Sequence, residues 1–560
     1  MKKGWLIICI LMSSIVQAQT RNYPKGYFRN PMNIPMELVA NFGELRTNHW
    51  HMGLDIRTQQ RENLPVYAAA DGYIARIKIE SGGFGRAIYI NHPNGYTTLY
   101  AHLNNFTPAL EQWVKTQQYN KESWAVELAP PSNLFPVAKG DFIAYSGNTG
   151  GSAGPHVHFE IRDTKTEKCL NPLLFGFPIA DGVAPPIQRI AMYDRNRSVY
   201  DQTPQQLGLR RSGNNYTLSP SGLIKVGTDK VSFALGMVDF FTGSTNPNGV
   251  YSARILLDGI LQSEFILDNI GYDETRYMNA HTDFRYKAVG GPWLQHVSRL
   301  PGDFTSIYTP EDKDGIIELQ DTDPHSVRIE VRDAAQNLST LNFNLQYNPA
   351  LPAPSAPVGQ RWLPRQVNIF ESENFEAFST ERTLYDAVTV TFSAKPGSNT
   401  ASSLFTFMGT SIPVHDHVTV RIKPNFPISA EDRNKVIIRS ISGSRTLVQK
   451  AAWQGEWVWS NFRQFGTYQA FVDNIPPVIN TPPTDLRKVM KLVFTPTDNF
   501  KTIKRFKATL NGKWLRFTND KSRNWIYTFD ENFPPGQHEL KVIVEDEAGN
   551  ITERTWTVNR

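Results

Sequence analysis

Two histidines separated by one residue follow a glycine-rich stretch in the N-terminal third of the chain. The sequence runs Gly147-Asn-Thr-Gly-Gly-Ser-Ala-Gly-Pro-His156-Val-His158-Phe-Glu160-Ile. Its first half favours a tight loop, and the alternation that follows favours a strand. Successive side chains of a strand point to opposite faces, so His156 and His158 share a face, about 7 Å apart. Such a pair can bind a metal ion, or bind it with one imidazole and transfer protons with the other.

A second pair, His51 and Asp55, lies about a hundred residues earlier in Arg46-Thr-Asn-His-Trp-His51-Met-Gly-Leu-Asp55. Their spacing would place them together on a helix, but Gly53 and the short surroundings favour a loop or an irregular strand. In either conformation the two side chains can converge on one ion. Taken alone, the pair would also fit a surface loop with a paired His and Asp.

The histidines are concentrated in this region: six of the twelve in the chain fall between His49 and His158, among them His102 in Tyr100-Ala-His-Leu. A catalytic zinc takes three N or O ligands at about 2.0–2.2 Å and keeps a fourth position for water. His51, Asp55 and one of the His156/His158 pair supply such a set. The metal would lower the pKa of its water to about 7, and the remaining histidines could take a proton or stabilise an oxyanion.

Other hydrolytic plans are absent from the sequence. It contains no His-Glu-x-x-His helix. Gly150-Gly-Ser-Ala-Gly154 matches Gly-x-Ser-x-Gly in letters, but it leads into the predicted strand and not into the helix of a nucleophile elbow. Cys169 stands in Lys165-Thr-Glu-Lys-Cys-Leu, where nothing suggests activation. The metal-centred interpretation is therefore the one that the residues favour.

The ordered set His51-x-x-x-Asp55, Pro65-Val66, Gly82-Gly-Phe-Gly85, Tyr100-x-His102-Leu and Gly154-Pro-His156-x-His158-Phe-Glu resembles the lysostaphin/LytM-type zinc metallo-endopeptidases over about residues 43–163. The resemblance implies a compact antiparallel β fold with a narrow groove and cleavage of peptide cross-links in peptidoglycan. It also implies that His51, Asp55 and His158 bind Zn²⁺ and that His102 and His156 assist catalysis. One departure is the long segment 106–138, which we expect to insert a helix near the groove and to restrict substrate or act as a lid.

The elements that position these residues are predicted to be mainly short strands. Two alternating runs flank Pro93-Asn-Gly95, which indicates a hairpin. Thr107-Pro108 is a good helix start, and we expect that helix to run to about Asn120. His92, next to the hairpin turn, is expected to be structural.

The rest of the chain also predicts β structure. Val331-Arg-Asp-Ala-Ala-Gln-Asn337 matches Val544-Glu-Asp-Glu-Ala-Gly-Asn550, which indicates a repeated unit. The fold class is mainly β: a compact antiparallel metallopeptidase domain followed by three β-sandwich, immunoglobulin-like domains. We predict a signal peptide at 1–18, the peptidase domain at 19–182, sandwiches at 183–348, 365–474 and 475–560, and a Pro-rich linker at 349–364.

The N-terminal residues and the net charge indicate where the protein acts and which kinds of partner it can bind. Lys2 and Lys3, an apolar run and Val16-Gln-Ala18 predict an export signal, so we expect the mature protein in the periplasm or cell envelope, or secreted. No later run is long enough for a transmembrane helix. The formal charge of +5, or +3 without the two signal lysines, does not favour nucleic acid but is compatible with an anionic wall.

Three further features have simpler explanations. His415-Asp-His417 lacks other ligands nearby, so a hydrogen-bonded strand face is expected. The Asp333/Asn337 and Asp546/Asn550 turns offer oxygen ligands for calcium, but side chains that cap their own turn explain them better. Trp457 and Trp459 could form a glycan platform, although their strand spacing favours sandwich packing.

The predicted function is zinc-dependent hydrolysis of peptidoglycan peptide cross-links, with the β-sandwiches positioning the enzyme or binding envelope proteins. The alternative is a catalytically silent scaffold that binds the wall or activates other wall hydrolases. A silent copy with intact ligands would still bind metal, so turnover is what separates the two.

Overall fold

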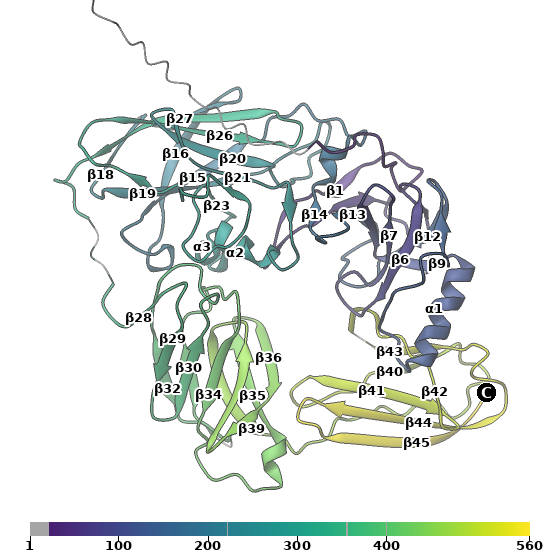
Figure 1. The fold of residues 1–560 in the computed structure, drawn as a ribbon. Helices are drawn as coiled ribbons and strands as arrows, with labels where there is room; N and C mark the ends of the chain where they lie inside the picture. Colours follow the sequence, from purple (N-terminus) through teal and green to yellow (C-terminus); the bar gives the residue numbers. More distant parts are fainter. Residues whose placement is uncertain (1–21, 221, 354, 356, 399, 523) are drawn as a thin grey trace, which may run out of the picture.

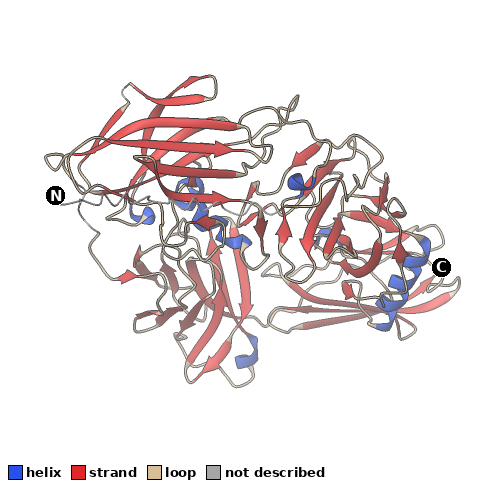
Figure 2. Ribbon diagram, turned by 45° about the horizontal axis from the view of Figure 1, so that its top comes forward, coloured by secondary structure: helices blue, strands red, loops and turns tan. Residues whose placement is uncertain are grey.

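The structure is a computed structural model that describes residues 22–560 except 221, 354, 356, 399 and 523. The predicted signal peptide therefore lies outside the described residues. Strands dominate the chain and helices are few (Figure 2). Figure 1 shows four β-rich domains that follow one another around a ring, with the last one returning to the first. The mainly β fold class predicted from the sequence is confirmed.

The N-terminal domain is built on one antiparallel sheet with strand order β1-β4-β13-β8-β7-β6-β10, beside a small sheet of order β5-β12-β9. The large sheet is made of β1 Leu38–Ala40, β4 Leu54–Arg57, β13 His156–Asp163, β8 Tyr96–Ala101, β7 Arg86–Asn91, β6 Gly72–Ile79 and β10 Val126–Leu128. The small sheet is made of β5 Pro65–Tyr67, β12 Phe142–Ser146 and β9 Leu103–Phe106. Buried aliphatic and aromatic side chains of both sheets form one core, which includes Ile56, Ile88, Tyr100, Val157 and Phe159.

Two local predictions for this domain are confirmed. β7 and β8 pair around the Pro93-Asn-Gly turn, where Gly95 has φ 84°, a backbone conformation that favours glycine. Helix α1 spans Pro108–Asn120 with Pro at its start, which suits a position where no backbone N–H is needed. Leu110 and Val114 bury one face of this helix against the domain.

The second domain is a sandwich whose strands lie in one continuous twelve-stranded sheet. Its main strands are β15 Ile187–Asp194, β16 Gln205–Ser212, β17 Asn215–Ser219, β19 Lys230–Met237, β20 Ser252–Leu257, β21 Ile260–Ile266, β26 His325–Arg332 and β27 Leu338–Tyr347. Short helices follow β21: η3 Thr275–Tyr277, α2 Met278–His281 and α3 Phe284–Ala288. Strand β22 (Asn269–Ile270) pairs with β14 (Cys169–Leu170), so this domain extends the large sheet of the first.

The third domain packs two five-stranded sheets face to face. One contains β29 Asn368–Glu371, β30 Phe375–Ser379, β34 Val418–Ile422, β38 Trp457–Phe462 and β37 Ala452–Gln454; the other contains β32 Phe392–Lys395, β33 Leu404–Phe407, β39 Gly466–Val472, β35 Val436–Ser442 and β36 Arg445–Lys450. We predicted a strand face for His415, but the residue lies in a bend before β34. It stacks on Tyr277 of the second domain at 3.8 Å between ring centroids, a contact between domains that the sequence did not predict.

The last domain has a four-stranded and a two-stranded sheet. The strands are β40 Lys491–Phe494, β43 Trp525–Thr528, β41 Ile503–Leu510, β42 Lys513–Trp514, β44 Gln537–Asp546 and β45 Ile551–Asn559. This domain docks on the outer face of α1, where Lys115 contacts Asp530 at 2.8 Å and Tyr119 packs edge-on against Trp514. The inserted helix thus carries the contact that closes the ring in Figure 1.

In the described part of the chain, no helix combines the length and the apolar character needed to cross a membrane.

Candidate functional site

The site is assembled on two neighbouring strands of the large sheet. β4 and β13 pair in antiparallel register with His158 directly opposite Asp55, and residues opposite each other in such a pair point to the same face. His51 follows the two-residue strand β3 (His49–Trp50) and reaches the same face through the turn at Gly53. A Cβ at Gly53 would lie 2.4 Å from the carbonyl oxygen of Phe159, so glycine permits the close approach of the two segments.

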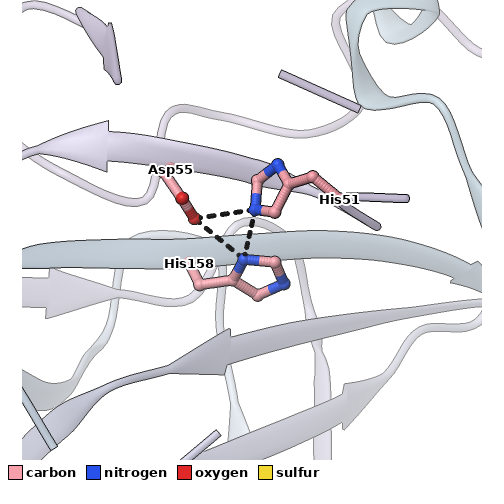
Figure 3. A group of neighbouring side chains, drawn as sticks. All are labelled: His51, Asp55 and His158. Carbon is pink, nitrogen blue, oxygen red and sulfur yellow. Dashed lines mark hydrogen bonds and ion pairs between the residues drawn. The ribbon is translucent and has the colours of Figure 1, made fainter. Parts of the chain in front are cut away.

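The three residues converge on one point, as Figure 3 shows. His51 Nε2 lies 3.0 Å from Asp55 Oδ1 and 3.0 Å from His158 Nδ1, and His158 Nδ1 lies 2.9 Å from Asp55 Oδ1. Ligands of one tetrahedral ion at 2.1 Å would be separated by about 3.4 Å. The group could therefore hold a metal ion.

The remaining nitrogen of each imidazole in this group has a fixed acceptor. His51 Nδ1–H donates to the carbonyl of Asn41 at 2.7 Å, and His158 Nε2–H donates to Glu160 Oε1 at 2.9 Å. His51 Nε2 and His158 Nδ1 are therefore the ring atoms that face Asp55, and each carries a lone pair when its ring is neutral and donates to Asp55 when its ring is protonated. Burial opposes ionisation of Asp55, but the positive potential of His51 and hydrogen bonds from the histidines hold the pKa of that carboxyl well below its usual range.

His102 and His156 lie beside the candidate metal-binding residues His51, Asp55 and His158, which we call the metal group. Their ring centroids are 4.7 Å apart, His102 is 6.0 Å from the His158 ring, and His156 Nε2 is 3.4 Å from Asp55 Oδ1. His102 has φ 59° at the end of β8, an uncommon backbone conformation for a non-glycine residue and one that clusters at functional sites. Burial, and then the charges of His156 and His158, lower the pKa of His102 to about 3, so its imidazole is neutral near pH 7.

Both of these histidines donate Nδ1–H to the glycine-rich loop. His102 donates to the carbonyl of Thr149 at 2.8 Å, and His156 donates to the carbonyl of Gly154 at 2.8 Å, with Ser152 Oγ at 3.2 Å. The Nε2 atom of each ring is thus left as an acceptor on the side of the metal group. The structure brings together all five residues that the sequence singled out.

Behind His158 lies a buried charged network that the sequence analysis did not identify. Glu160 is fully buried and accepts from Arg162 at 2.7 Å, from the thiol of Cys169 at 3.3 Å and from the hydroxyl of Tyr272. Burial opposes ionisation, but Arg162 and His158 lower the pKa of Glu160 to about 2. The i, i+2 spacing of His158, Glu160 and Arg162 on one strand face could have indicated this network from the sequence. Nothing in the sequence indicated Tyr272, because it comes from another domain.

The other candidate features make hydrogen bonds within the fold, although His415 does so from a bend and not from the expected strand face. The Asp turns cap themselves: Asn337 N donates to Asp333 Oδ1, and Asn550 N donates to Asp546 Oδ1, both at 2.8 Å. Asp333 and Asp546 also belong to groups of three carboxylates that could hold a metal ion, Asp181/Asp239/Asp333 and Asp473/Asp498/Asp546. His92 bonds the Asp71 carbonyl and the Thr98 hydroxyl, each at 2.8 Å. His415 bonds the Tyr385 hydroxyl at 3.1 Å, and among the described residues no metal-binding group includes it.

Residues 49–119 match the model of peptidase family M23, residues 362–473 match a Zu5-like domain, and residues 486–559 match a bacterial Ig-like domain. The chain carries an M23 peptidase domain. The resemblance to the lysostaphin/LytM family and the immunoglobulin-like character of the C-terminal domain are thereby confirmed.

Several curated relatives of the chain are named as peptidases or metalloproteases, and one is named as a cell division protein. An uncharacterized metalloprotease of Haemophilus influenzae is 30% identical over 28% of this chain and 28% of its own length. The DD-carboxypeptidase/endopeptidase Mpg of Neisseria meningitidis is 38% identical over 21% of this chain and 21% of its own length. Among solved structures, the catalytic domain of lysostaphin from Staphylococcus simulans is 23% identical with a TM-score of 0.17, and the match covers 28% of this chain and 92% of that one.

The chain thus aligns with about a quarter of the length of these curated relatives.

Proposed function

We propose that the M23 domain is a zinc-dependent endopeptidase that hydrolyses peptide cross-links of bacterial peptidoglycan. The observation that carries the proposal is the convergence of His51, Asp55 and His158 within 3.0 Å of one another, with His102 and His156 alongside. The names of the curated relatives, which include a DD-carboxypeptidase/endopeptidase and a peptidoglycan DD-endopeptidase of Vibrio cholerae, support a peptidase that acts on the cell wall.

The donor set fits Zn²⁺. Two imidazole nitrogens and one carboxylate oxygen are the ligand types that zinc takes in proteins, and a set of three protein ligands leaves a fourth position open. His51 and His158 each present one lone pair to the group because the other ring nitrogen donates to Asn41 or Glu160. A zinc ion bound there would supply a water of pKa about 7 and polarise a substrate carbonyl.

The proton chemistry falls to His102 and His156. Their Nδ1–H groups are held by Thr149 and Gly154, so Nε2 is the atom of each ring that can accept a proton from the attacking water or pass one to the leaving amine. The low pKa of His102 keeps its imidazole neutral near pH 7, so one ring nitrogen carries a lone pair. His156, whose Nε2 lies 3.4 Å from Asp55 Oδ1, would stabilise negative charge on a tetrahedral oxyanion when its ring is protonated.

We further propose that the protein acts outside the cytoplasm, in the periplasm or cell envelope or after secretion. The support is the predicted export signal at 1–18 together with the envelope location of the proposed substrate. The β-sandwiches would then hold the peptidase in place or bind envelope proteins.

The deciding experiment is release of soluble fragments from purified cross-linked peptidoglycan by the wild type, His102→Ala and His51→Ala proteins. We expect cleavage by the wild type, loss of cleavage with retained zinc in His102→Ala, and loss of both in His51→Ala. If the wild type binds zinc but releases nothing from several cross-link types, the domain is instead a non-catalytic scaffold that binds the wall or activates other hydrolases.

A further inference from the structure

The acceptors that fix the metal-binding imidazoles are themselves held by the second domain. The Asn41 side chain donates Nδ2–H to the carbonyl of Gly249 and accepts from Gly249 N, both at 2.8 Å. Glu160 accepts the hydroxyl of Tyr272. Each histidine of the metal group is therefore one hydrogen bond away from a residue that is bonded to the first β-sandwich.

The fit between these two domains is close at the site. A Cβ at Gly249 would lie 2.6 Å from Glu44 N and 2.7 Å from the carbonyl carbon of Gly43, so a larger residue cannot occupy that position. Thr275 Oγ1 accepts from the backbone N–H of Trp50, next to His51, at 2.9 Å. Trp50 is fully buried in the core that the second domain forms. The sandwich therefore supports both sides of the metal group.

The last domain makes equivalent bonds to the loop that holds the other two histidines. Lys521 Nζ donates to the carbonyl of Ser152 at 2.7 Å and to Asn148 Oδ1 at 3.1 Å. Gly150 N donates to Asp520 Oδ1 at 2.8 Å. These contacts alternate along the loop with Thr149 and Gly154, whose carbonyls accept from His102 and His156.

A second contact fixes this arrangement to the neighbouring loop of the M23 domain. Lys521 N donates to the carbonyl of Ser81 at 2.6 Å, and the hydroxyls of Ser522 and Ser81 lie 3.0 Å apart. The Gly82–Gly85 turn packs on the glycine-rich loop: a Cβ at Gly85 would lie 2.5 Å from the carbonyl carbon of Thr149. The C-terminal domain thus bridges both loops beside the catalytic pair.

We propose that two accessory domains each complete one half of the M23 active site. Tyr272 of the first sandwich is a positioning residue for the metal ligand His158, and Asp520 and Lys521 of the last sandwich are positioning residues for His102 and His156. The inference rests on the proposed function, because it assigns roles toward zinc binding and cleavage at that same site.

The first half is tested by zinc affinity of the full chain, measured by competition with a chromogenic chelator. Tyr272→Phe removes only the hydroxyl that fixes Glu160, and we expect zinc to bind about tenfold to a hundredfold more weakly, the usual cost of losing an outer-shell partner. Tyr308→Phe is the matched control, since its buried hydroxyl bonds His281 within the same domain at 2.8 Å and should leave zinc affinity unchanged.

Equal zinc affinity of Tyr272→Phe and the wild type would overturn this half. If the wild type itself binds no zinc, the proposed function fails, which is a separate result from a Tyr272 variant that binds as tightly as the wild type.

The second half is tested by turnover of a soluble cross-linked muropeptide. For the Asp520→Ala/Lys521→Ala protein we expect kcat to fall by about tenfold to a hundredfold while KM and zinc affinity are unchanged. The single variant Asp520→Asn, with native Lys521, keeps an acceptor oxygen for Gly150 N. Its kcat should lie between those of the double variant and the wild type. Lys507→Ala, which breaks the contact of the same domain with Glu122 on α1, is the control and should keep wild-type kcat.

A rise in kcat for the double variant would show that the last domain restrains the enzyme, and an unchanged kcat would show that it has no role in catalysis. Either result overturns this half of the proposal.

Discussion

At the scale of single residues, each imidazole of the site has one nitrogen committed to a fixed acceptor and the other directed inward. The acceptors are the carbonyls of Asn41, Thr149 and Gly154 and the carboxylate of Glu160. Since the outer bond sets the tautomer, the inner nitrogens present lone pairs at two neighbouring positions. One pair faces Asp55 and suits a metal ion, and the other suits proton transfer.

Glu160 and Arg162 form the buried ion pair on which this arrangement depends. Arg162→Met should lower the free energy of unfolding by about 3–5 kcal/mol, because it leaves the carboxylate of Glu160 buried without its cation. Adding Glu160→Gln to that variant should recover part of the loss, since the uncompensated charge is then gone. Urea denaturation of the wild type, both single variants and the double variant measures the coupling; additive losses would contradict the buried-pair explanation.

At the scale of elements, the site depends on how closely the segment between His51 and Asp55 approaches β13. The pairing of β4 with β13 sets His158 opposite Asp55, but His51 joins them only because the chain turns tightly over the strand at Gly53. There the backbone passes against Phe159, Glu160 and His158.

Gly53→Ala should therefore damage the metal group and the fold together. Its Cβ would lie 2.4 Å from Phe159 O and 3.1 Å from His158 Cε1, so the strands must separate, at a cost of about 1–3 kcal/mol. Zinc affinity should fall as well, because His51 moves away from its partners. Thermal unfolding and chelator competition measure the two effects.

Gly154→Ala is the matched control for this change. It lies in the loop beside His156, and a Cβ there meets no atom within 4 Å. We expect a change in unfolding free energy within about 0.5 kcal/mol. Equal behaviour of the two variants would show that close approach at Gly53 does not constrain the site.

At the scale of the whole molecule, the two domain junctions on either side of the ring are built alike. Asp181, in the connection to the second domain, lies with Asp239 and Asp333, and Asp473, in the connection to the last, lies with Asp498 and Asp546. Asn337 donates to the carbonyl of Asp181 at 3.4 Å and Asn550 to that of Asp473 at 2.8 Å. The repeat detected in the sequence thus fixes how each sandwich joins the domain before it.

The first junction should make stability depend on pH. Burial, and then the charges of Asp181 and Asp333, raise the pKa of Asp239 to about 8. Because this pKa is above the unfolded value near 4, its contribution to stability is complete below pH 4 and is lost as pH rises toward 8. Asp239→Asn should be more stable than the wild type at pH 8, by about 2–5 kcal/mol, and nearly equal to it at pH 4. Chelated buffers and urea denaturation at both pH values measure this; the same difference at the two values would contradict it.

The contact that closes the ring can be trapped chemically. Ser81 and Ser522 hydroxyls are 3.0 Å apart, so Ser81→Cys/Ser522→Cys should form a disulfide under mild oxidation. The native Cys169 is fully buried and does not compete. Non-reducing electrophoresis should show a faster-migrating species that neither single variant gives; its absence would mean that the last domain does not dock on the first in solution.

The sequence by itself determined a great deal of the site. Spacing alone set His156 and His158 on one face of a strand, the turn residues set the β7–β8 hairpin, and Pro108 set the start of α1. These features are local, because strand alternation, turn chemistry and a proline at the first helical position act over a few residues. The candidate ligands could also be identified from residue type, because only a few side chains bind zinc or carry protons near pH 7.

Tertiary structure alone decided which residues support that chemistry. Tyr272 stands 112 positions from Glu160, and Lys521 stands 369 from Ser152, and no periodicity or motif links residues so far apart. The stacking of His415 on Tyr277 is likewise a contact with another domain. Contacts of this kind arise from the packing of whole domains, where burial and surface fit rather than local backbone preference select the partners.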